Sequence, residues 1–178
     1  MKKLLYSAFI LAAGILASCD DTDLGGPKND PGATATVALA GEWYVHMDGI
    51  DAQGNVVEND PYGAGDFELL TYNTAADDAT KMFVDDQGKF WDFKGEVNCD
   101  VNALTFSGSN ITNLSYEGMT FEVLGGKILL GAATSPFGHK VDSICFDVKF
   151  SDDEYIGIAW NAMRFSGYRR TGFDQGAE

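Results

Sequence analysis

The clearest hydrophobic pattern in the chain is a strict alternation from residue 91 to residue 101. The odd positions are apolar or small, whereas the even positions are charged or carry an amide. Because successive side chains of a β-strand point to opposite faces of the sheet, this pattern predicts a strand with one buried and one solvated face. Residues 143–150 repeat the pattern, with Ile144, Phe146 and Val148 on the apolar face.

Shorter apolar runs predict further strands, and no stretch after residue 19 shows the apolar stripe of an amphipathic helix. The additional strands are expected at residues 41–48, 66–72, 81–84, 104–107, 119–124, 127–134 and 155–170. Turn-forming residues separate them at 60–63, 85–88, 125–126, 135–138 and 151–154. Many short antiparallel strands with short links predict an all-β barrel or sandwich.

The alternation also bears on the cysteines. Cys99 falls on the apolar face of its strand, whereas Cys145 falls on the solvated face of another. A disulfide needs converging Cβ vectors, so this placement disfavours a bridge between the two.

The N-terminus has the order of a lipoprotein signal. Lys2 and Lys3 precede an apolar run over residues 4–16, which ends in Leu16-Ala17-Ser18-Cys19. The run is too short to span a bilayer of roughly 30 Å. Small residues before a cysteine form a lipobox, so we expect cleavage before Cys19 and lipidation of its thiol. The chain would then be held at a membrane through this anchor.

The segment after the cysteine lacks the apolar residues that folding requires. Residues 20–33 contain four Asp, three Gly and two Pro. Such a composition predicts a flexible tether. The expected organisation is therefore a signal peptide at 1–18, a lipidated tether at 19–37 and a β-barrel domain at 38–178.

Charge excludes one class of partner. Without Lys2 and Lys3, the chain keeps 10 basic and 27 acidic side chains, a formal net charge of −17. Nucleic-acid binding depends on neutralising phosphates, so we expect no nucleic-acid partner for this acidic protein. The sequence predicts no oligomeric state.

The first predicted strand opens with Gly41-Glu42-Trp43, and the last ends near Arg169 and Arg170. A Gly-x-Trp start resembles the lipocalin and calycin pattern, in which the Trp closes one end of a barrel and an Arg from the last strand packs over it. The resemblance implies an antiparallel barrel of eight or slightly more strands. Either Arg169 or Arg170 could cap Trp43 by a cation–π contact.

Five longer segments resemble one family together. They are Tyr72-Asn73-Thr74-Ala75, Phe90-Trp91-Asp92-Phe93-Lys94, Val97-Asn98-Cys99-Asp100, Asp142-Ser143-Ile144 and Tyr168-Arg169-Arg170-Thr171-Gly172-Phe173. They are similar to lipoproteins of gut anaerobes described as lipid-binding putative hydrolases, over most of residues 40–175. Acidic residues directly after the cysteine resemble a surface-export signal in that group, which implies an outer-membrane lipoprotein exposed on the cell surface. In enteric bacteria an Asp at that position resembles a retention signal, so the periplasmic face is the alternative.

The expected function is binding of an apolar or amphipathic ligand, such as a small lipid, inside the barrel. The expected lining of the lumen is Trp43, Phe67, Phe93, Val97, Phe121, Phe146 and Val148. Small residues at positions 95 and 131–133 would leave room for a ligand, whereas the large aromatic residues favour a filled core. With a filled core the protein would be a structural or adhesion subunit that uses exposed rings such as Tyr62, Phe137 and Phe173.

A hydrolase is the other alternative, and its residues are Ser135, His139 and Asp142. No Gly-x-Ser-x-Gly elbow accompanies them, and a triad is defined by geometry. His46 is expected on the outer face of its strand. The acidic clusters at 85–86 and 152–154 match no ordered Ca²⁺ loop and are interpreted as solvated turns, so no metal or cofactor is expected.

Asp142-Ser143-Ile144 also resembles an O-glycosylation site of this bacterial group. The alternation places Ser143 on the solvated face, where a glycosyltransferase could reach it. An ordinary strand serine is the alternative.

Overall fold

The computed structural model describes residues 33–172. Within this part, the chain forms nine strands and no helix. The strands are β1 (Gly41–Ile50), β2 (Val56–Asn59), β3 (Phe67–Asn73), β4 (Lys81–Asp85), β5 (Lys94–Asp100), β6 (Thr105–Thr112), β7 (Thr120–Thr134), β8 (Lys140–Phe150) and β9 (Ala162–Arg169). No helix of the described part is long and apolar enough to cross a membrane.

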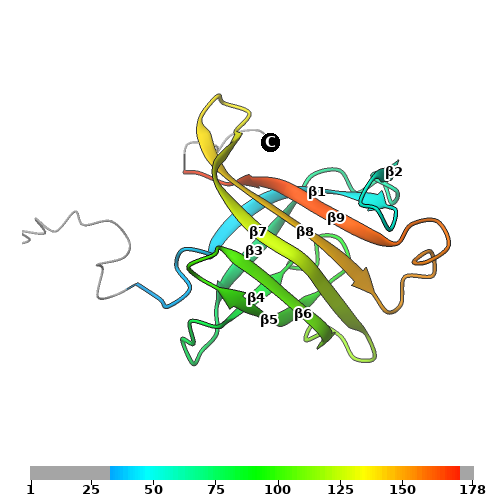
Figure 1. Ribbon diagram of the computed structural model, residues 1–178, viewed down its shortest axis with the longest axis horizontal. Coiled ribbons are helices and arrows are strands. Elements are labelled where there is room, and N and C mark those ends of the chain that lie inside the picture. The colour runs from blue at the N-terminus through cyan, green and yellow to red at the C-terminus, as the bar shows by residue number, and fades with distance from the viewer. Residues whose placement is uncertain (1–32, 173–178) are drawn as a thin grey trace, which may run out of the picture. The chain divides into compact units, whose positions relative to one another are not determined.

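Eight of the strands close into an antiparallel barrel (Figure 1). β1 pairs with β3, each following strand pairs with the next, and β9 returns to β1 from Trp43↔Arg169 to Ile50↔Ala162. The extra strand, β2, pairs only with the last residues of β1. This architecture confirms the predicted lipocalin-like all-β barrel.

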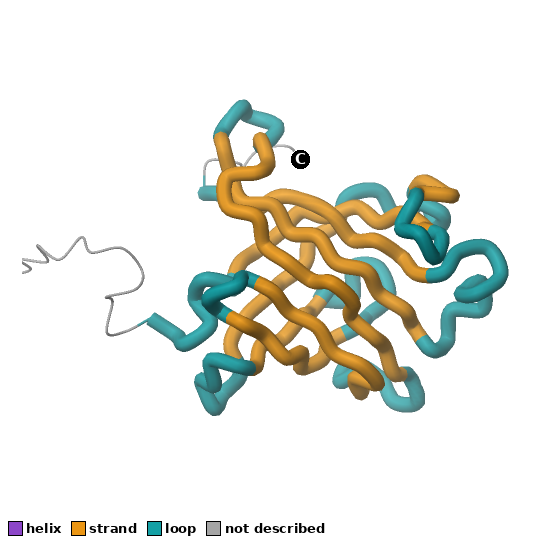
Figure 2. The backbone as a smooth tube through the Cα atoms, viewed as in Figure 1, coloured by secondary structure: helices purple, strands orange, loops and turns teal. Residues whose placement is uncertain are grey.

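The barrel has two different ends, where the loops gather (Figure 2). The Trp43 end is the one where β1 begins; it carries residues 34–40 and the links 74–80, 101–104 and 135–139. The aromatic end is the one where β1 finishes; it carries the links 51–55, 60–66, 86–93, 113–119 and 151–161.

Residues just before the predicted boundary at residue 38 pack with the barrel. Thr36 is fully buried, as is Leu39. The compact unit accordingly begins at Thr34. The signal peptide, Cys19 and the segment 20–32 lie outside the described residues, as does Phe173.

One expected turn is a strand interior instead. β7 runs without a break through Gly125-Gly126. A β-bulge at these glycines shifts the register against β8 between Leu124 and Lys127. A Cβ on Gly126 would lie 2.5 Å from ring atoms of Phe106. Glycine therefore serves a bulge and a close ring contact here, and the prediction of two separate strands was wrong.

Two predicted strands are shorter than expected. β5 begins at Lys94 rather than at residue 91, because residues 86–93 wrap around the Asp86 carboxylate. β9 begins at Ala162, and residues 151–161 form a loop held by its own side chains. The sequence also missed β2, whose four residues are all exposed and show no period.

The two cysteines are free and half-buried, as the disfavoured bridge implied. The Cys99 side chain packs against the core, and its thiol contacts the carbonyl oxygen of Ala79 at 3.5 Å. Burial raises the pKa of both thiols, which lowers their reactivity as thiolates.

Candidate functional site

The Trp43 end is sealed by a polar and aromatic cap. Trp43 is fully buried, and its indole N–H donates to the hydroxyl of Thr71 at 2.9 Å. The Thr71 hydroxyl in turn donates to the carbonyl of Leu39 at 2.6 Å. The Arg169 guanidinium lies 4.4 Å from the centre of the Trp43 ring.

Arg169 is also tied to its surroundings by hydrogen bonds. It donates to the carbonyl of Ala40 at 2.6 Å and pairs with Asp142 at 3.1 Å. Arg170 points elsewhere and pairs with Glu42 on the outer wall. The structure thus places Arg169, and not Arg170, over the ring that closes this end.

Arg169→Ala should lower the free energy of unfolding by about 2 kcal/mol, because it removes the cation–π contact and the hydrogen bond to the Ala40 carbonyl. Arg170→Ala removes only a solvent-exposed ion pair and should lower the free energy of unfolding far less. Urea unfolding of the two variants measures both values. Equal losses would mean that Arg169 does not seal the Trp43 end.

The seven residues expected to line the lumen all lie in the core. Rings occupy this space: Phe93 lies 5.3 Å from Phe121 and 5.8 Å from Phe165, and Phe146 stacks on Phe165 at 5.2 Å between ring centres. Gly95 makes no space for a ligand, because a Cβ at this position would lie within 2.6 Å of side-chain atoms of Ile111 and Phe121. Side chains therefore fill the middle of the barrel.

The other expected small residues lie elsewhere. Gly131 and Ala132 are exposed, and Ala133 is half-buried, in the part of β7 that leaves the barrel. They line no lumen, so the expectation that they make room for a ligand was wrong.

Tyr62 is the centre of a ring cluster at the aromatic end. Its ring lies 5.1 Å from Trp91, 5.7 Å from Trp160 and 6.4 Å from Tyr155. Its hydroxyl donates to Asp153 at 2.8 Å, and the Trp160 indole donates to the other oxygen of Asp153 at 3.1 Å. Burial of the ring and this hydrogen bond raise the pKa of Tyr62. The hydroxyl therefore remains a donor at neutral pH.

A second carboxylate connects the cluster to a neighbouring loop. Asp152 accepts from the Trp91 indole at 2.9 Å and from the Tyr116 hydroxyl at 2.7 Å. Burial and this contact raise the pKa of Tyr116 to about 12. Loop 151–161 is thus held over the barrel by paired carboxylates that bind aromatic donors. The expected solvated turn at 152–154 is wrong for Asp153, which is buried.

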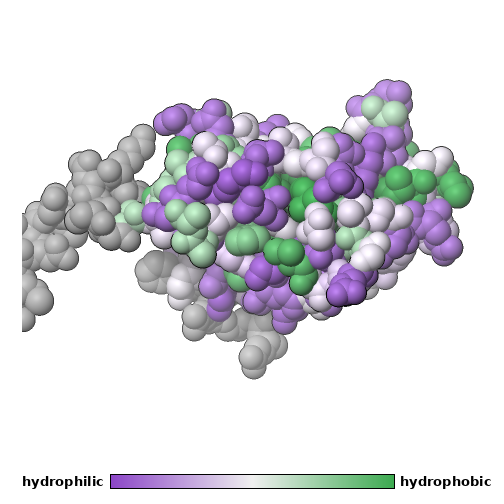
Figure 3. All heavy atoms as spheres, turned by 90° about the horizontal axis from the view of Figure 1, so that it is seen from below, coloured by the Kyte–Doolittle hydropathy of each residue, from purple (hydrophilic) through white to green (hydrophobic). Residues whose placement is uncertain are grey.

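The rim of this cluster is apolar and exposed. Ile158 is 82 % exposed, and Leu114 is 57 % exposed. Tyr155 and Tyr62 are also exposed, and hydrophobic surface gathers at this end of the molecule (Figure 3). We name Tyr62, Trp91, Tyr116, Tyr155, Ile158 and Trp160 the aromatic mouth.

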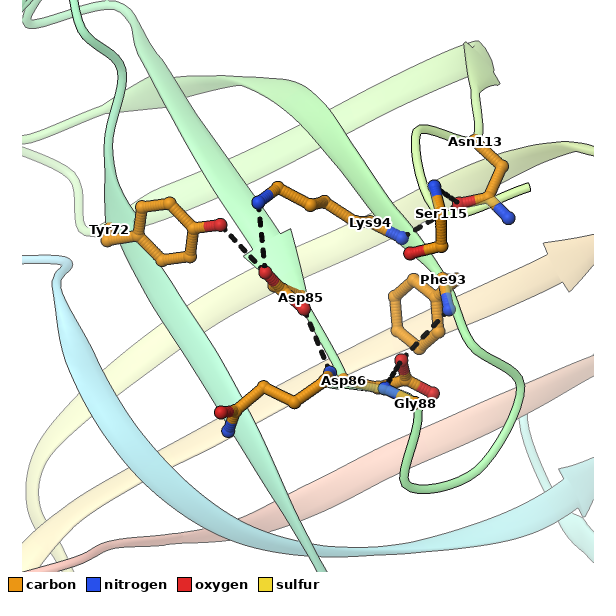
Figure 4. A network of polar contacts seen from close by, with 9 residues as sticks. Tyr72, Asp85, Asp86, Gly88, Phe93, Lys94, Asn113 and Ser115 are labelled. Atoms are coloured by element: carbon orange, nitrogen blue, oxygen red, sulfur yellow. Dashed lines mark hydrogen bonds and ion pairs between the residues drawn. The ribbon is translucent and has the colours of Figure 1, made fainter. Parts of the chain in front are cut away.

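The opposite side of the mouth is anchored by Asp86 (Figure 4). This buried carboxylate accepts hydrogen bonds from five backbone N–H groups, those of Gly88, Phe90, Trp91, Asp92 and Phe93. Burial raises the pKa of Asp86, and the five donors oppose that rise. Asp86 is therefore no solvated turn residue, as the sequence had suggested, but the organiser of loop 86–93.

Two further groups hold the adjoining strands (Figure 4). The Asn113 side chain accepts from the backbone N–H groups of Lys94 and Ser115. On the outer wall, Asp85 accepts from the Tyr72 hydroxyl at 2.7 Å and pairs with Lys94 at 3.3 Å. These contacts fix the loops 86–93 and 113–119.

The weak catalytic candidates are not joined into a hydrogen-bonded chain. The Ser135 hydroxyl is buried and has no hydrogen-bond partner. Asp142 accepts from the Gly131 backbone at 2.9 Å and from Arg169 at 3.1 Å, so both of its oxygens bind other groups. The backbone carbonyl of His139 accepts a hydrogen bond from the Ser135 N–H at 2.9 Å.

One serine–histidine contact was not foreseen from the sequence. On the outer wall, the Ser166 hydroxyl lies 3.2 Å from Nε2 of His46, which is exposed as predicted. Asp48 lies 3.7 Å from the same nitrogen. A triad needs the carboxylate on the other ring nitrogen, so this contact lacks that geometry.

Ser143 lies on the outer side of β8 and is half-buried. Its hydroxyl donates to the carbonyl of Gly167 at 2.8 Å. Its glycosylation stays a prediction.

Two further features of the described residues bear on ligands. No group of three or more His, Cys, Asp and Glu side chains in this part of the chain is placed to hold a metal ion. A shallow groove of about 360 Å³ lies over β5, β6 and β7, among Asn98, Asp100, Thr105, Ser107 and Lys127. These residues lie near the Trp43 end, so the groove is separate from the aromatic mouth.

Most of the aromatic mouth was not predicted from the sequence. The sequence pattern predicted Tyr62 at a loop tip, and Trp91 and Trp160 within strands. Aromatic residues close to Asp in the sequence, at 60–62, 91–92 and 152–155, were the signal that could have identified it, because buried indole and phenol groups need acceptors.

A family model described as "lipid-binding putative hydrolase" matches residues 28–174, which include every strand of the barrel. No curated protein matches the chain.

Proposed function

The chain belongs to the family of lipid-binding putative hydrolases, and from this premise we propose that it binds a lipid or another amphipathic molecule at the aromatic mouth. Family membership and the barrel fold support lipid binding. The observation that carries the proposed location is the exposure of Ile158 and Leu114, in loops that also carry rings of the cluster.

The filled interior explains why the mouth is the better location. A ligand that entered the lumen would have to displace Phe93, Phe165 and their neighbours, which pack at ring distances of 5–6 Å. At the mouth, Tyr and Trp offer apolar faces beside polar edges, which suits a molecule with both characters.

Charge indicates which head group fits. The mouth carries the carboxylates of Asp152 and Asp153, and Glu154 follows them in the same loop. An anionic head group would be repelled there. We therefore propose an uncharged or cationic amphiphile as the ligand.

Ile158→Asp should weaken ligand binding by about tenfold or more, because burying an isoleucine side chain contributes roughly 1.5–3 kcal/mol. Titration with a fluorescent acyl-chain probe that has an uncharged head group measures the affinity. Val37→Asp is the matched control, because Val37 is an exposed apolar residue near the Trp43 end. If both variants bound the probe as the wild type does, the ligand would not sit at the mouth.

Membrane anchoring through Cys19 is the second part of the proposal. Two or more acyl chains suffice for stable attachment, because each buried CH₂ contributes about 0.8 kcal/mol. The barrel would hang on residues 20–33, and a flexible chain of that length would have a root-mean-square reach of roughly 20 Å. Support comes from the order of charged, apolar and small residues before Cys19.

Cys19→Ala should move the protein from the membrane fraction to a soluble or unprocessed form. Immunoblots of separated fractions measure this change. Protease treatment of intact cells distinguishes the two faces: cleavage supports cell-surface exposure, whereas protection until lysis indicates the periplasmic side. A variant that stayed in the membrane fraction at the size of the processed protein would contradict anchoring through Cys19.

A further inference from the structure

The hairpin between β7 and β8 extends beyond the barrel (Figure 1). β6 makes its last contact with β7 at Thr105↔Lys127, and β9 makes its last contact with β8 at Ser143↔Tyr168. Leu129, at the base of the extension, pairs with Ser143, and beyond it β7 and β8 pair only with each other, at Ala133↔Val141 and Thr134↔Lys140. We name residues 129–141 the hairpin tip.

The hairpin tip is ordered by its own hydrogen bonds. The Ser135 N–H donates to the His139 carbonyl at 2.9 Å, and the Gly138 N–H donates to the Ser135 carbonyl at 2.9 Å. The Gly131 N–H donates to Asp142 at the base. The tip is therefore an ordered extension of the sheet.

Large apolar side chains are exposed on this projection. Leu129 is 43 % exposed, Leu130 is 68 % exposed and Phe137 is 51 % exposed. Three such residues lie within nine positions of one projecting hairpin, which makes it a candidate contact site for an apolar partner.

The tip differs from the rest of the protein in its charge. The chain has 27 acidic residues among 178, yet the 17 residues from 125 to 141 include no Asp or Glu. The same stretch carries Lys127, His139 and Lys140. Asp142, at its base, is paired with Arg169. Asp77 and Asp78 lie in a loop of this end, and Asp100 is the last residue of β5, but the tip projects past the barrel end on which they lie.

The chain enters the domain at this same end. Arg169 bridges the carbonyl of Ala40, just before β1, to Asp142 at the base of the hairpin. Fourteen residues separate Cys19 from Thr34, where the compact unit begins. A lipid on Cys19 would therefore hold the hairpin within tens of ångströms of the bilayer.

We propose that the hairpin tip docks on the lipid bilayer that holds Cys19, a proposal that rests on the proposed lipidation. Leu129, Leu130 and Phe137 enter the interface between head groups and acyl chains, and Lys127 and Lys140 contact lipid phosphates. The tether makes this contact effectively intramolecular, so a small apolar surface suffices. The aromatic mouth then faces away from that bilayer.

The test uses the full lipidated protein in vesicles of phosphatidylethanolamine with a minority of phosphatidylglycerol. An environment-sensitive dye is attached at Leu130→Cys, and the vesicles contain a lipid with a nitroxide on its acyl chain. Ile158→Cys is the matched control, because Ile158 is 82 % exposed at the opposite end. The wild-type chain serves as the blank for Cys99 and Cys145.

We expect the dye at position 130 to shift to shorter wavelength and to lose at least half of its emission to the nitroxide, with little loss at position 158. Equal emission loss at both positions, or none at position 130, would overturn the proposal. So would shielding of position 130 from aqueous iodide without nitroxide quenching, because a second copy would then cover the tip. Flotation of the protein with the vesicles reports on the anchor separately, and failure to float removes the premise.

Discussion

Replacing Asp86 with alanine should lower the free energy of unfolding by about 3–5 kcal/mol. The carboxylate is fully buried and is the shared acceptor of five backbone N–H groups of loop 86–93, at 2.8–3.2 Å. Alanine leaves these donors without a partner, and a buried N–H without an acceptor is costly. The loop also carries Trp91, so the aromatic mouth should lose its shape as well.

Two control variants test whether the loss comes from the acceptor oxygens of Asp86. Asp86→Asn keeps one acceptor oxygen and should cost less than alanine does. Asp92→Asn lies in the same loop, is exposed and has a φ of 54°, which Asn tolerates, so it should be nearly neutral. Urea unfolding followed by tryptophan fluorescence measures all three. A loss below about 1 kcal/mol for Asp86→Ala would show that water replaces the carboxylate easily.

Gly167→Ala should cost roughly 3 kcal/mol or more, because overpacking against the backbone cannot be relieved by a rotamer change. A Cβ at this position would lie 1.9 Å from the Tyr44 carbonyl oxygen and 2.7 Å from the Val45 Cα. These atoms belong to β1, so the seam that closes the barrel between β1 and β9 would have to open.

Gly172→Ala is the matched control, because a Cβ there would meet no atom within 4 Å. We expect a normal melting temperature for this variant and a decrease of several degrees for Gly167→Ala. Hydrogen exchange should also be faster in β1 and β9 of the Gly167 variant. Equal melting temperatures would mean that the seam can shift at little cost.

The barrel could be predicted from the sequence because its strands bury one face. Period-two alternation marks β5 and β8, and the Gly41-Glu42-Trp43 start indicated the closed end. β2 could not be predicted, because all of its side chains are exposed and no period distinguishes them from a loop.

The choice between Arg169 and Arg170 required the structure. Both follow the same run of residues, and the register of β9 against β1 decides which one reaches Trp43. The same limit applies to Asp86 and Asp153, which look like solvated turn residues in the sequence. Their burial comes from backbone N–H groups and aromatic donors that the fold brings to them.

The aromatic mouth combines segments that are far apart in the chain. Tyr62, Trp91 and Trp160 come from three different loops and meet only because the barrel closes. No local pattern could predict this meeting. Ligand binding at the mouth is accordingly a proposal that depends on the fold.

Photo-crosslinking of a bound lipid tests the central claim most directly. The protein is purified, loaded with an uncharged lipid that carries a diazirine on its acyl chain, and irradiated, and the modified peptides are identified by mass spectrometry. Binding at the aromatic mouth predicts crosslinks in residues 60–66, 86–93 and 151–161, with few elsewhere. Crosslinks confined to the Trp43 end or to the groove over β5–β7 would contradict it.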